Sequence, residues 1–181
     1  MTPLLSASAV LWALAIAVGA VDGLYFHLWK YRLHARAESW TEHLTHLGRA
    51  FLLPPTLWLA FLLGAAGTAA ERLVPLIALI VLDAVLGLWD VMLETASRRA
   101  LGGLQRSEYL VHVVATALHS GAEALAVAAW ALAATGRAAF AIREPVFARA
   151  LASVLLPAAI AAALLHAALL YPRFRAARRQ D

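Results

Sequence analysis

Acidic residues and histidines recur at helical spacing inside segments that are otherwise apolar. Glu42 and His46 are four residues apart, and so are Glu108 and His112. Residues four apart lie on one face of an α-helix, so each pair would present a carboxylate and an imidazole in the same direction. These two ligand types together suit iron, manganese or zinc. The spacing therefore predicts metal-binding chemistry.

Other polar residues extend these faces, and their positions along the helices divide them into two layers. Asp22 ends one apolar segment, while Asp90 and Glu94 share a face near the end of another. We expect one layer of groups where the helices end, comprising Asp22, Glu42, His46, Asp90, Glu94, Glu108 and His112. A rise of 1.5 Å per residue places Asp83, His119 and Glu123 about 10 Å deeper. This second layer would relay protons or form a second site.

The first layer contains two copies of an Asp plus a Glu-x-x-x-His motif. It resembles the ligand pattern of ferritin-like di-metal carboxylate four-helix bundles, which combine lone Glu residues with Glu-x-x-His motifs. This chain departs from that pattern, because its lone carboxylates are Asp22 and Asp90 and its motif spacing is i, i+4. The resemblance implies two divalent metal ions, with iron first and zinc or manganese as the other choices. Independently, clustered carboxylates in a low-dielectric pocket need cations to stay ionised.

The composition is that of a membrane protein. Apolar residues make up 63% of the 181 residues and charged residues 14%, against roughly 45–50% and 25% in soluble domains. This excludes an ordinary soluble enzyme, a disordered tail and a nucleic-acid-binding domain. Cysteine is absent, so thiolate chemistry and disulfides are excluded.

The predicted fold is an all-α integral membrane bundle in a single domain, residues 1–181. A membrane helix needs about 20 mostly apolar residues, and five stretches qualify: Leu4–Phe26, Thr41–Leu63, Leu73–Leu93, Tyr109–Ala134 and Phe147–Tyr171. Eleven basic residues fall on one side of these spans, and four, Arg72, Arg137, Arg143 and Arg149, fall on the other. Basic loops stay in the cytoplasm, so we expect an outside N-terminus and a cytoplasmic C-terminus, as in a bacterial inner membrane. The arginine-rich tail, Arg173 to Arg179, would act as a stop-transfer signal or touch anionic lipid.

An internal repeat organises the first four spans. Asp22 matches Asp90 at an offset of 68, and Glu42 and His46 match Glu108 and His112 at an offset of 66. We expect two helical hairpins of the same orientation, about 4–68 and 73–136, forming a four-helix bundle. The additional helix, about 147–171, would pack on that bundle.

Several of the polar residues have a simpler interpretation than metal binding. His27 is either a further ligand or an interfacial residue, and His166 either caps the site or bonds between helices. Glu38, His34 and His43 are expected to be solvated. Pro54 and Pro55 should break or kink the second span. The competing explanation for all the polar groups is an ion-free network to which Arg49 and Arg106 contribute.

Four functions remain open at this stage. The first is an oxidoreductase with a dinuclear metal centre, di-iron by the ferritin-like resemblance, that acts on a lipid-soluble substrate. The others are a zinc membrane hydrolase, a b-type haem protein with His46 and His112 as axial ligands, and a proton or metal-ion transporter. Membrane lipid or a lipid-soluble substrate is the expected partner, nucleic acid is not, and a homo-oligomer stays open.

Overall fold

The structure is a computed structural model that describes residues 2–63, 68–136 and 145–177. Within these ranges the chain is helical and has no strand. The long helices are α1 (Thr2–Ala20), which continues as the π-helix η1 (Val21–Lys30), α2 (Trp40–Leu57), which continues as the π-helix η4 (Trp58–Leu62), α3 (Ala69–Ser97), α4 (Arg106–Ala134) and α5 (Val146–Ala177). Short 3₁₀ turns, η2 (Leu33–Ala35), η3 (Ala37–Ser39) and η5 (Arg99–Leu101), lie in the connections.

Four helical segments of the described chain are long and apolar enough to cross a membrane. They are Pro3–Lys30, Ala69–Ser97, Arg106–Ala134 and Val146–Pro172, which overlap four of the five expected spans. The remaining expected span corresponds to α2 and η4 and is not among them. Its first half carries Glu42, His43, His46 and Arg49, which lower its hydropathy. The length and hydropathy of these four helices thus agree with the expectation of a membrane protein.

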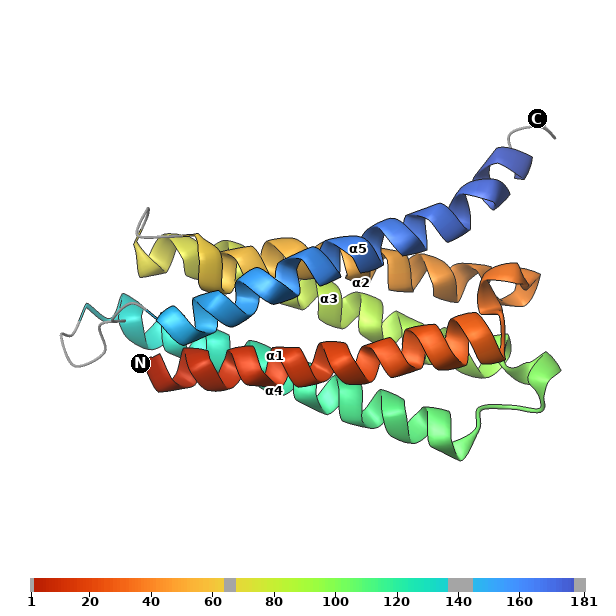
Figure 1. The fold of residues 1–181 in the computed structure, drawn as a ribbon, viewed down its shortest axis with the longest axis horizontal. Helices are drawn as coiled ribbons and strands as arrows, with labels where there is room; N and C mark the ends of the chain where they lie inside the picture. Colours follow the sequence, from red (N-terminus) through yellow and green to blue (C-terminus); the bar gives the residue numbers. More distant parts are fainter. Residues whose placement is uncertain (1, 64–67, 137–144, 178–181) are drawn as a thin grey trace.

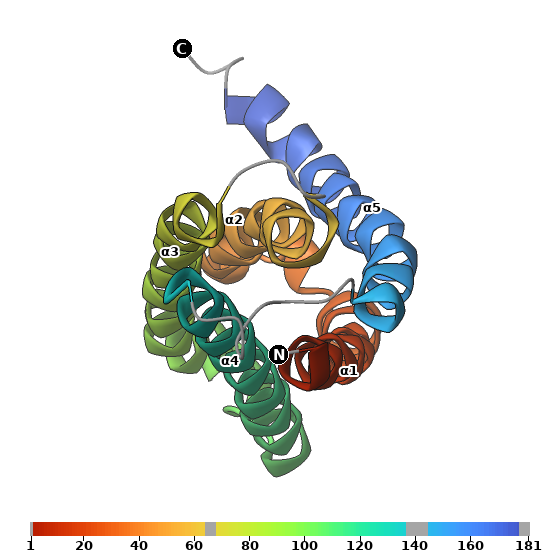
Figure 2. The same ribbon diagram turned by 90° about the vertical axis from the view of Figure 1, so that its left-hand side faces the viewer.

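The five helices form a ring rather than a four-helix bundle with one helix added outside. Figure 2, viewed along the bundle, shows α1, α4, α3, α2 and α5 in that order around the ring. Helix α5 packs against both α1 and α2 and separates them. In Figure 1 the N-terminus and the C-terminus lie at opposite ends of the bundle. All of the ring helices can therefore project side chains into a shared interior.

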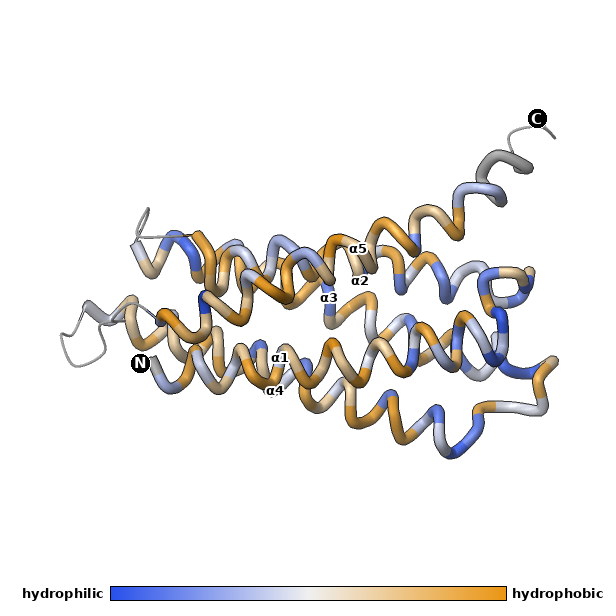
Figure 3. Tube along the Cα trace, viewed as in Figure 1, coloured by the Kyte–Doolittle hydropathy of each residue, from blue (hydrophilic) through white to orange (hydrophobic). Residues whose placement is uncertain are grey.

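The bundle is apolar and tightly packed at the N-terminal end of α1. Leu5, Trp12, Leu57 and Leu76 are fully buried there, and alanines of α4 and α5 join the same cluster. Small residues let helices approach closely in a membrane, and Ser8 Oγ donates a 2.7 Å hydrogen bond across to the Ala122 carbonyl. Figure 3 shows that hydrophilic positions gather instead toward the other end, at the α1–α2 and α3–α4 connections. The polar chemistry is therefore concentrated at one end of a rigid scaffold.

Local sequence explains two of the helix boundaries. Thr68 begins α3 with a capping box, in which its side chain accepts from the Glu71 N–H and Glu71 accepts from the Thr68 N–H. Of the break or kink expected at Pro54 and Pro55, the break does not occur, because α2 runs through both residues and continues as η4 from Trp58. Such π-type adjustments accommodate proline in membrane helices.

Some basic residues used for the orientation lie outside the described residues. These are Arg137, Arg143, Arg178 and Arg179.

Candidate metal centre

The seven expected ligands gather at the end of the bundle that carries the α1–α2 and α3–α4 connections. Four helices contribute, with Asp22 from η1, Glu42 and His46 from α2, Asp90 and Glu94 from α3, and Glu108 and His112 from α4. Together with His27 and Arg98 we call these residues the end cluster. Three groups in it have ligand atoms within 4.8 Å of one another: Asp22, His27 and His112; His27, Glu42 and His46; and Glu94, Glu108 and His112.

Aspartates and histidines pair across the two halves of the sequence. Asp22 Oδ2 lies 2.7 Å from His112 Nε2, and Asp90 Oδ1 lies 3.5 Å from His46 Nε2. The other ring nitrogen of His112 contacts Glu94. Each histidine therefore faces the aspartate that the sequence places in the opposite half.

Arg98 is a central residue of the end cluster that the sequence analysis missed. Its side chain is fully buried, with Nη1 2.8 Å from Glu42 Oε2 and Nη2 2.6 Å from Glu108 Oε1. The same guanidinium also lies 3.0 Å from His27 Nε2. Burial alone would lower the pKa of Arg98, but the hydrogen bonds to Glu42 and Glu108 raise it above its ordinary value. The residue therefore stays charged and ties together the two Glu-x-x-x-His motifs.

His27 joins the end cluster because of an unusual helical turn. The segment from Val21 to Lys30 is a π-helix, in which hydrogen bonds run between residues five apart. Asp22 and His27 are five apart, so the π-helix brings them to one side, and His27 Nε2 lies 3.5 Å from Asp22 Oδ2. Ordinary α-helical spacing would have pointed the two residues in different directions.

Several ligand atoms of the end cluster lack a hydrogen bond within the described chain. Asp22 Oδ1, His46 Nε2 and Glu108 Oε2 are buried without one. His46 Nε2 is 3.6 Å from Glu42 Oε1, and His27 Nε2 is 3.7 Å from Glu108 Oε1. These gaps are too long for good hydrogen bonds. They are close to the roughly 3.0–3.4 Å that separates two ligands sharing a metal with bonds of about 2.1 Å.

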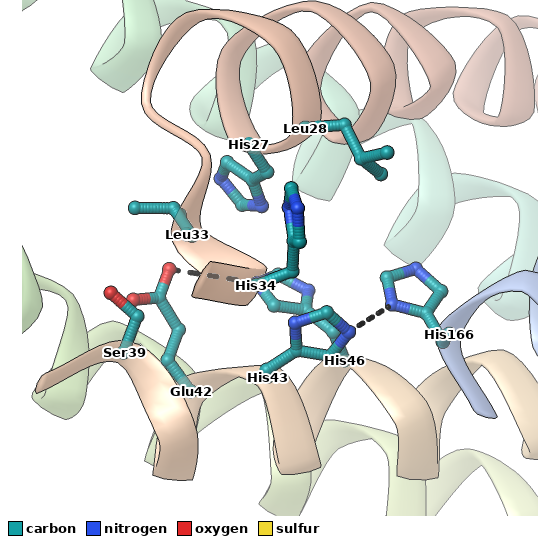
Figure 4. Close-up of a pocket in the computed structure, with 9 residues that line it drawn as sticks. All are labelled: His27, Leu28, Leu33, His34, Ser39, Glu42, His43, His46 and His166. Atoms are coloured by element: carbon teal, nitrogen blue, oxygen red, sulfur yellow. Dashed lines mark hydrogen bonds and ion pairs between the residues drawn. The ribbon is translucent and has the colours of Figure 1, made fainter. Parts of the chain in front are cut away.

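A small pocket lined by five histidines adjoins these atoms. Figure 4 shows His27 from η1 opposite His43 and His46 from α2, with His166 approaching from α5. The pocket has a volume of about 10 Å³, room for one water molecule or ion. His34 also lines this pocket. It was expected to be solvated, and in the structure it is half-buried.

His43 and His166 connect two helices beside this pocket. His43 is 7% exposed, so the expectation that it is solvated was wrong. Its Nε2 lies 3.2 Å from Nδ1 of His166. Of the two expected roles for His166, a hydrogen bond between helices is therefore the one observed. Glu38 is exposed, as expected.

Charge is strongly unbalanced in the end cluster. The cluster contains one guanidinium, that of Arg98, and five carboxylates, those of Asp22, Glu42, Asp90, Glu94 and Glu108. With neutral imidazoles the cluster has a formal charge of −4. Buried charge of this size is costly unless it is paired with cations.

A second group, the deep cluster, contains the three residues expected below the first layer together with Arg49. Arg49 Nε and Nη2 bond Asp83 at 3.1 and 3.2 Å, and His119 Nε2 lies 3.2 Å from Asp83 Oδ2 and 3.1 Å from Glu123 Oε1. The expected network role of Arg49 is thus present, whereas Arg106 is exposed at the start of α4. Asp83, His119 and Glu123 could also hold a cation.

A cavity of about 460 Å³, the central cavity, joins the two clusters. Its lining includes Asp22, His46 and His112 at one end and Asp83 and His119 at the other. The end cluster therefore opens onto a polar interior and is not sealed on all sides.

No family model, no curated protein and no solved structure matches this chain.

Proposed function

We propose that this protein is a membrane metalloprotein whose end cluster binds two divalent cations and that it acts as an oxidoreductase on a lipid-soluble substrate. The observation that carries the proposal is the formal charge of −4 in a cluster whose buried ligand atoms lack hydrogen bonds. Two divalent cations balance that charge without protonating any carboxylate. A cation would also give His46 Nε2 and Glu108 Oε2 the partners that they lack.

The ligands divide into two sets. His27, Glu42 and His46, with Asp90 beside them, would hold one cation. Asp22 and His112, with Glu94 and Glu108, would hold the other. Arg98 stays between the glutamates and keeps both carboxylates oriented.

Imidazole and carboxylate ligands suit iron, manganese and zinc, and iron is the choice for redox chemistry. Bound iron would supply one-electron steps between its +2 and +3 states. With peroxide as the oxidant, a substrate that gives up two electrons and two protons would yield the oxidised substrate and two waters. His119 and Glu123 in the deep cluster stand where protons could be passed along the central cavity.

A haem is a weaker choice for the same residues. Both ring nitrogens of His112 already contact carboxylates, and haem requires an apolar pocket. Zinc would use the same ligands in a hydrolase, so the identity of the metal separates that function from oxidation.

The same proposal includes five spans, two repeated hairpins and a cytoplasmic C-terminus. The matched contacts from Asp22 to His112 and from Asp90 to His46 support the repeat. The odd number of helices in the ring supports termini on opposite sides of the membrane.

Elemental analysis and an absorption spectrum of the detergent-purified protein test the proposal. We expect two transition-metal ions per chain, with iron in excess of zinc. His46→Ala and His112→Ala should each lower the metal content, while Glu38→Gln, an exposed carboxylate at the same end, should leave it unchanged. Fewer than about one tightly bound ion per chain would leave an ion-free network with protonated imidazoles as the better explanation, and a Soret band would indicate haem.

A further inference from the structure

A second large cavity, the lateral cavity, lies between α1, α2 and α5. Its volume is about 510 Å³, within the usual range for small-molecule sites of roughly 300–1,000 Å³. Leu24 of η1 and Leu165 of α5 line it and are 54% and 38% exposed. The lateral cavity therefore reaches the outer surface of the bundle between these two helices, where lipid would surround a membrane protein.

Two glycines on this wall have no role in packing. A Cβ at Gly19 or at Gly23 would meet no atom within 4 Å, although glycine in a helix is unfavourable relative to alanine. Both residues line the lateral cavity and the central cavity. The absent side chains leave open the space where the two cavities meet.

The inner end of the lateral cavity is polar. Arg49, Asp83 and His119 line it and also line the central cavity, so an apolar entrance leads to the deep cluster. Arg49 already bonds Asp83 through two nitrogens, and Glu123 adds a second carboxylate beside His119. This floor has no spare positive charge for an acidic head group.

Trp12 is one of the residues that line the lateral cavity, and it carries a hydrogen-bond donor without a partner in the described chain. Its ring packs edge-on against that of His119, which also lines the lateral cavity, with ring centroids 4.4 Å apart. The side chain is 1% exposed, and its indole N–H has no acceptor in the described part of the chain. A buried donor without an acceptor is costly, and a neutral carbonyl oxygen would satisfy it.

We infer that the lateral cavity binds a long-chain lipid with a neutral carbonyl head, which enters between α1 and α5 and places its head against Trp12 and His119. The inference rests on the proposed function, since the site leads into the central cavity beside the end cluster. Isoprenoid quinones and fatty aldehydes share this carbonyl chemistry. The alkyl chain lies along Leu24 and Leu165, and the glycines leave room for the head.

The test measures retention of three probes by protein in nanodiscs, relative to empty nanodiscs. The probes are a decyl-substituted benzoquinone, hexadecanal and palmitate. We expect saturable retention of the quinone or the aldehyde, which identifies the source of the carbonyl, and weaker retention of palmitate. Saturable palmitate binding that exceeds both neutral probes, or no saturable retention of either neutral probe, would overturn the inference.

Variants at one position separate the cavity from general effects on folding. Gly19→Leu should weaken retention at least about tenfold by filling the space, while Gly19→Ala should bind as the original protein does. Trp12→Phe keeps an aromatic ring at this position, removes the N–H donor and should weaken retention about tenfold. If Gly19→Leu retains the probe normally, the inference fails.

Metal content measured on the same samples separates this inference from the proposed function. Gly19-dependent retention without bound metal would overturn only the metal proposal. Bound metal without Gly19-dependent retention would overturn only the lipid site. Unchanged metal content in Gly19→Leu would also show that this variant has folded.

Discussion

In the deep cluster Arg49 holds Asp83 through two nitrogens, whereas in the end cluster Arg98 pairs with two of the five carboxylates, Glu42 and Glu108. With neutral imidazoles the deep cluster, which contains two carboxylates and one guanidinium, has a formal charge of −1, against −4 in the end cluster. The end cluster also leaves ligand atoms without hydrogen bonds. Two clusters of similar residue types thus differ in charge: the deep cluster can be complete by itself, and the end cluster is where we propose added cations.

The largest effect should follow from replacing Arg98 with Met. This change leaves Glu42 and Glu108 buried without their shared partner, which should cost about 3–5 kcal/mol of unfolding free energy in metal-free protein. Unfolding in detergent measures the loss. Arg106→Met removes an exposed arginine nearby and should change stability by less than about 0.5 kcal/mol. Equal stability of the two variants would contradict the central role of Arg98.

Metal binding should depend on the end cluster more than on the deep cluster. His112→Gln removes an imidazole that contacts Asp22 and Glu94 and should weaken metal affinity at least about tenfold. His119→Gln alters the deep cluster and should leave two ions per chain. Metal titration of both variants makes the comparison, and equal losses would mean that the deep cluster is itself a required metal site.

Substitutions in the deep cluster should change the stability of the protein and leave its metal content unchanged. Asp83→Asn removes the charged partner of Arg49 and should cost about 2 kcal/mol. The double variant Arg49→Met with Asp83→Leu should be less destabilised than Asp83→Asn alone, because it leaves no uncompensated charge. Additive losses in an unfolding experiment would argue against an internally balanced pair.

The smallest effect should come from Thr45, a hydroxyl that supports a ligand of the end cluster. Thr45 Oγ1 lies 2.6 Å from Asp90 Oδ1. Thr45→Val should cost about 1 kcal/mol of stability and lower metal affinity modestly. Thr56→Val is the matched control, because that hydroxyl bonds only the Leu52 carbonyl of its own helix among the contacts described. If both variants retain metal equally well, Thr45 does not orient Asp90.

Helical spacing predicted much of the candidate site. Glu42 with His46 and Glu108 with His112 each share a face because α2 and α4 are regular at these residues. Depth was also predictable, since the rise per residue separates Asp83 from Asp90 on one continuous helix.

Residues placed by irregular backbone could not be predicted in the same way. His27 depends on the π-helix of η1, which has no clear signal in the sequence. Arg98 follows the last residue of α3, where an arginine usually marks a loop at the membrane surface. The only indication in the sequence was the excess of carboxylates at one end of the helices, which favours a buried arginine as their partner.

The place of α5 in the ring was equally hidden. In a chain this apolar, every side of a membrane helix resembles a packing face, so periodicity does not tell which neighbours a helix contacts. Only the completed structure puts α5 between α1 and α2.

That arrangement has a consequence for biosynthesis. Helix α5 is made after α1, α2, α3 and α4, and it carries Ala158, Ala162 and Leu165 of the lateral cavity wall. The five carboxylates of the end cluster all precede it in the chain. A nascent chain could therefore bring its carboxylates together while the ring of helices is still open between α1 and α2. Insertion of α5 between α1 and α2 is the event that closes the ring of helices around its interior.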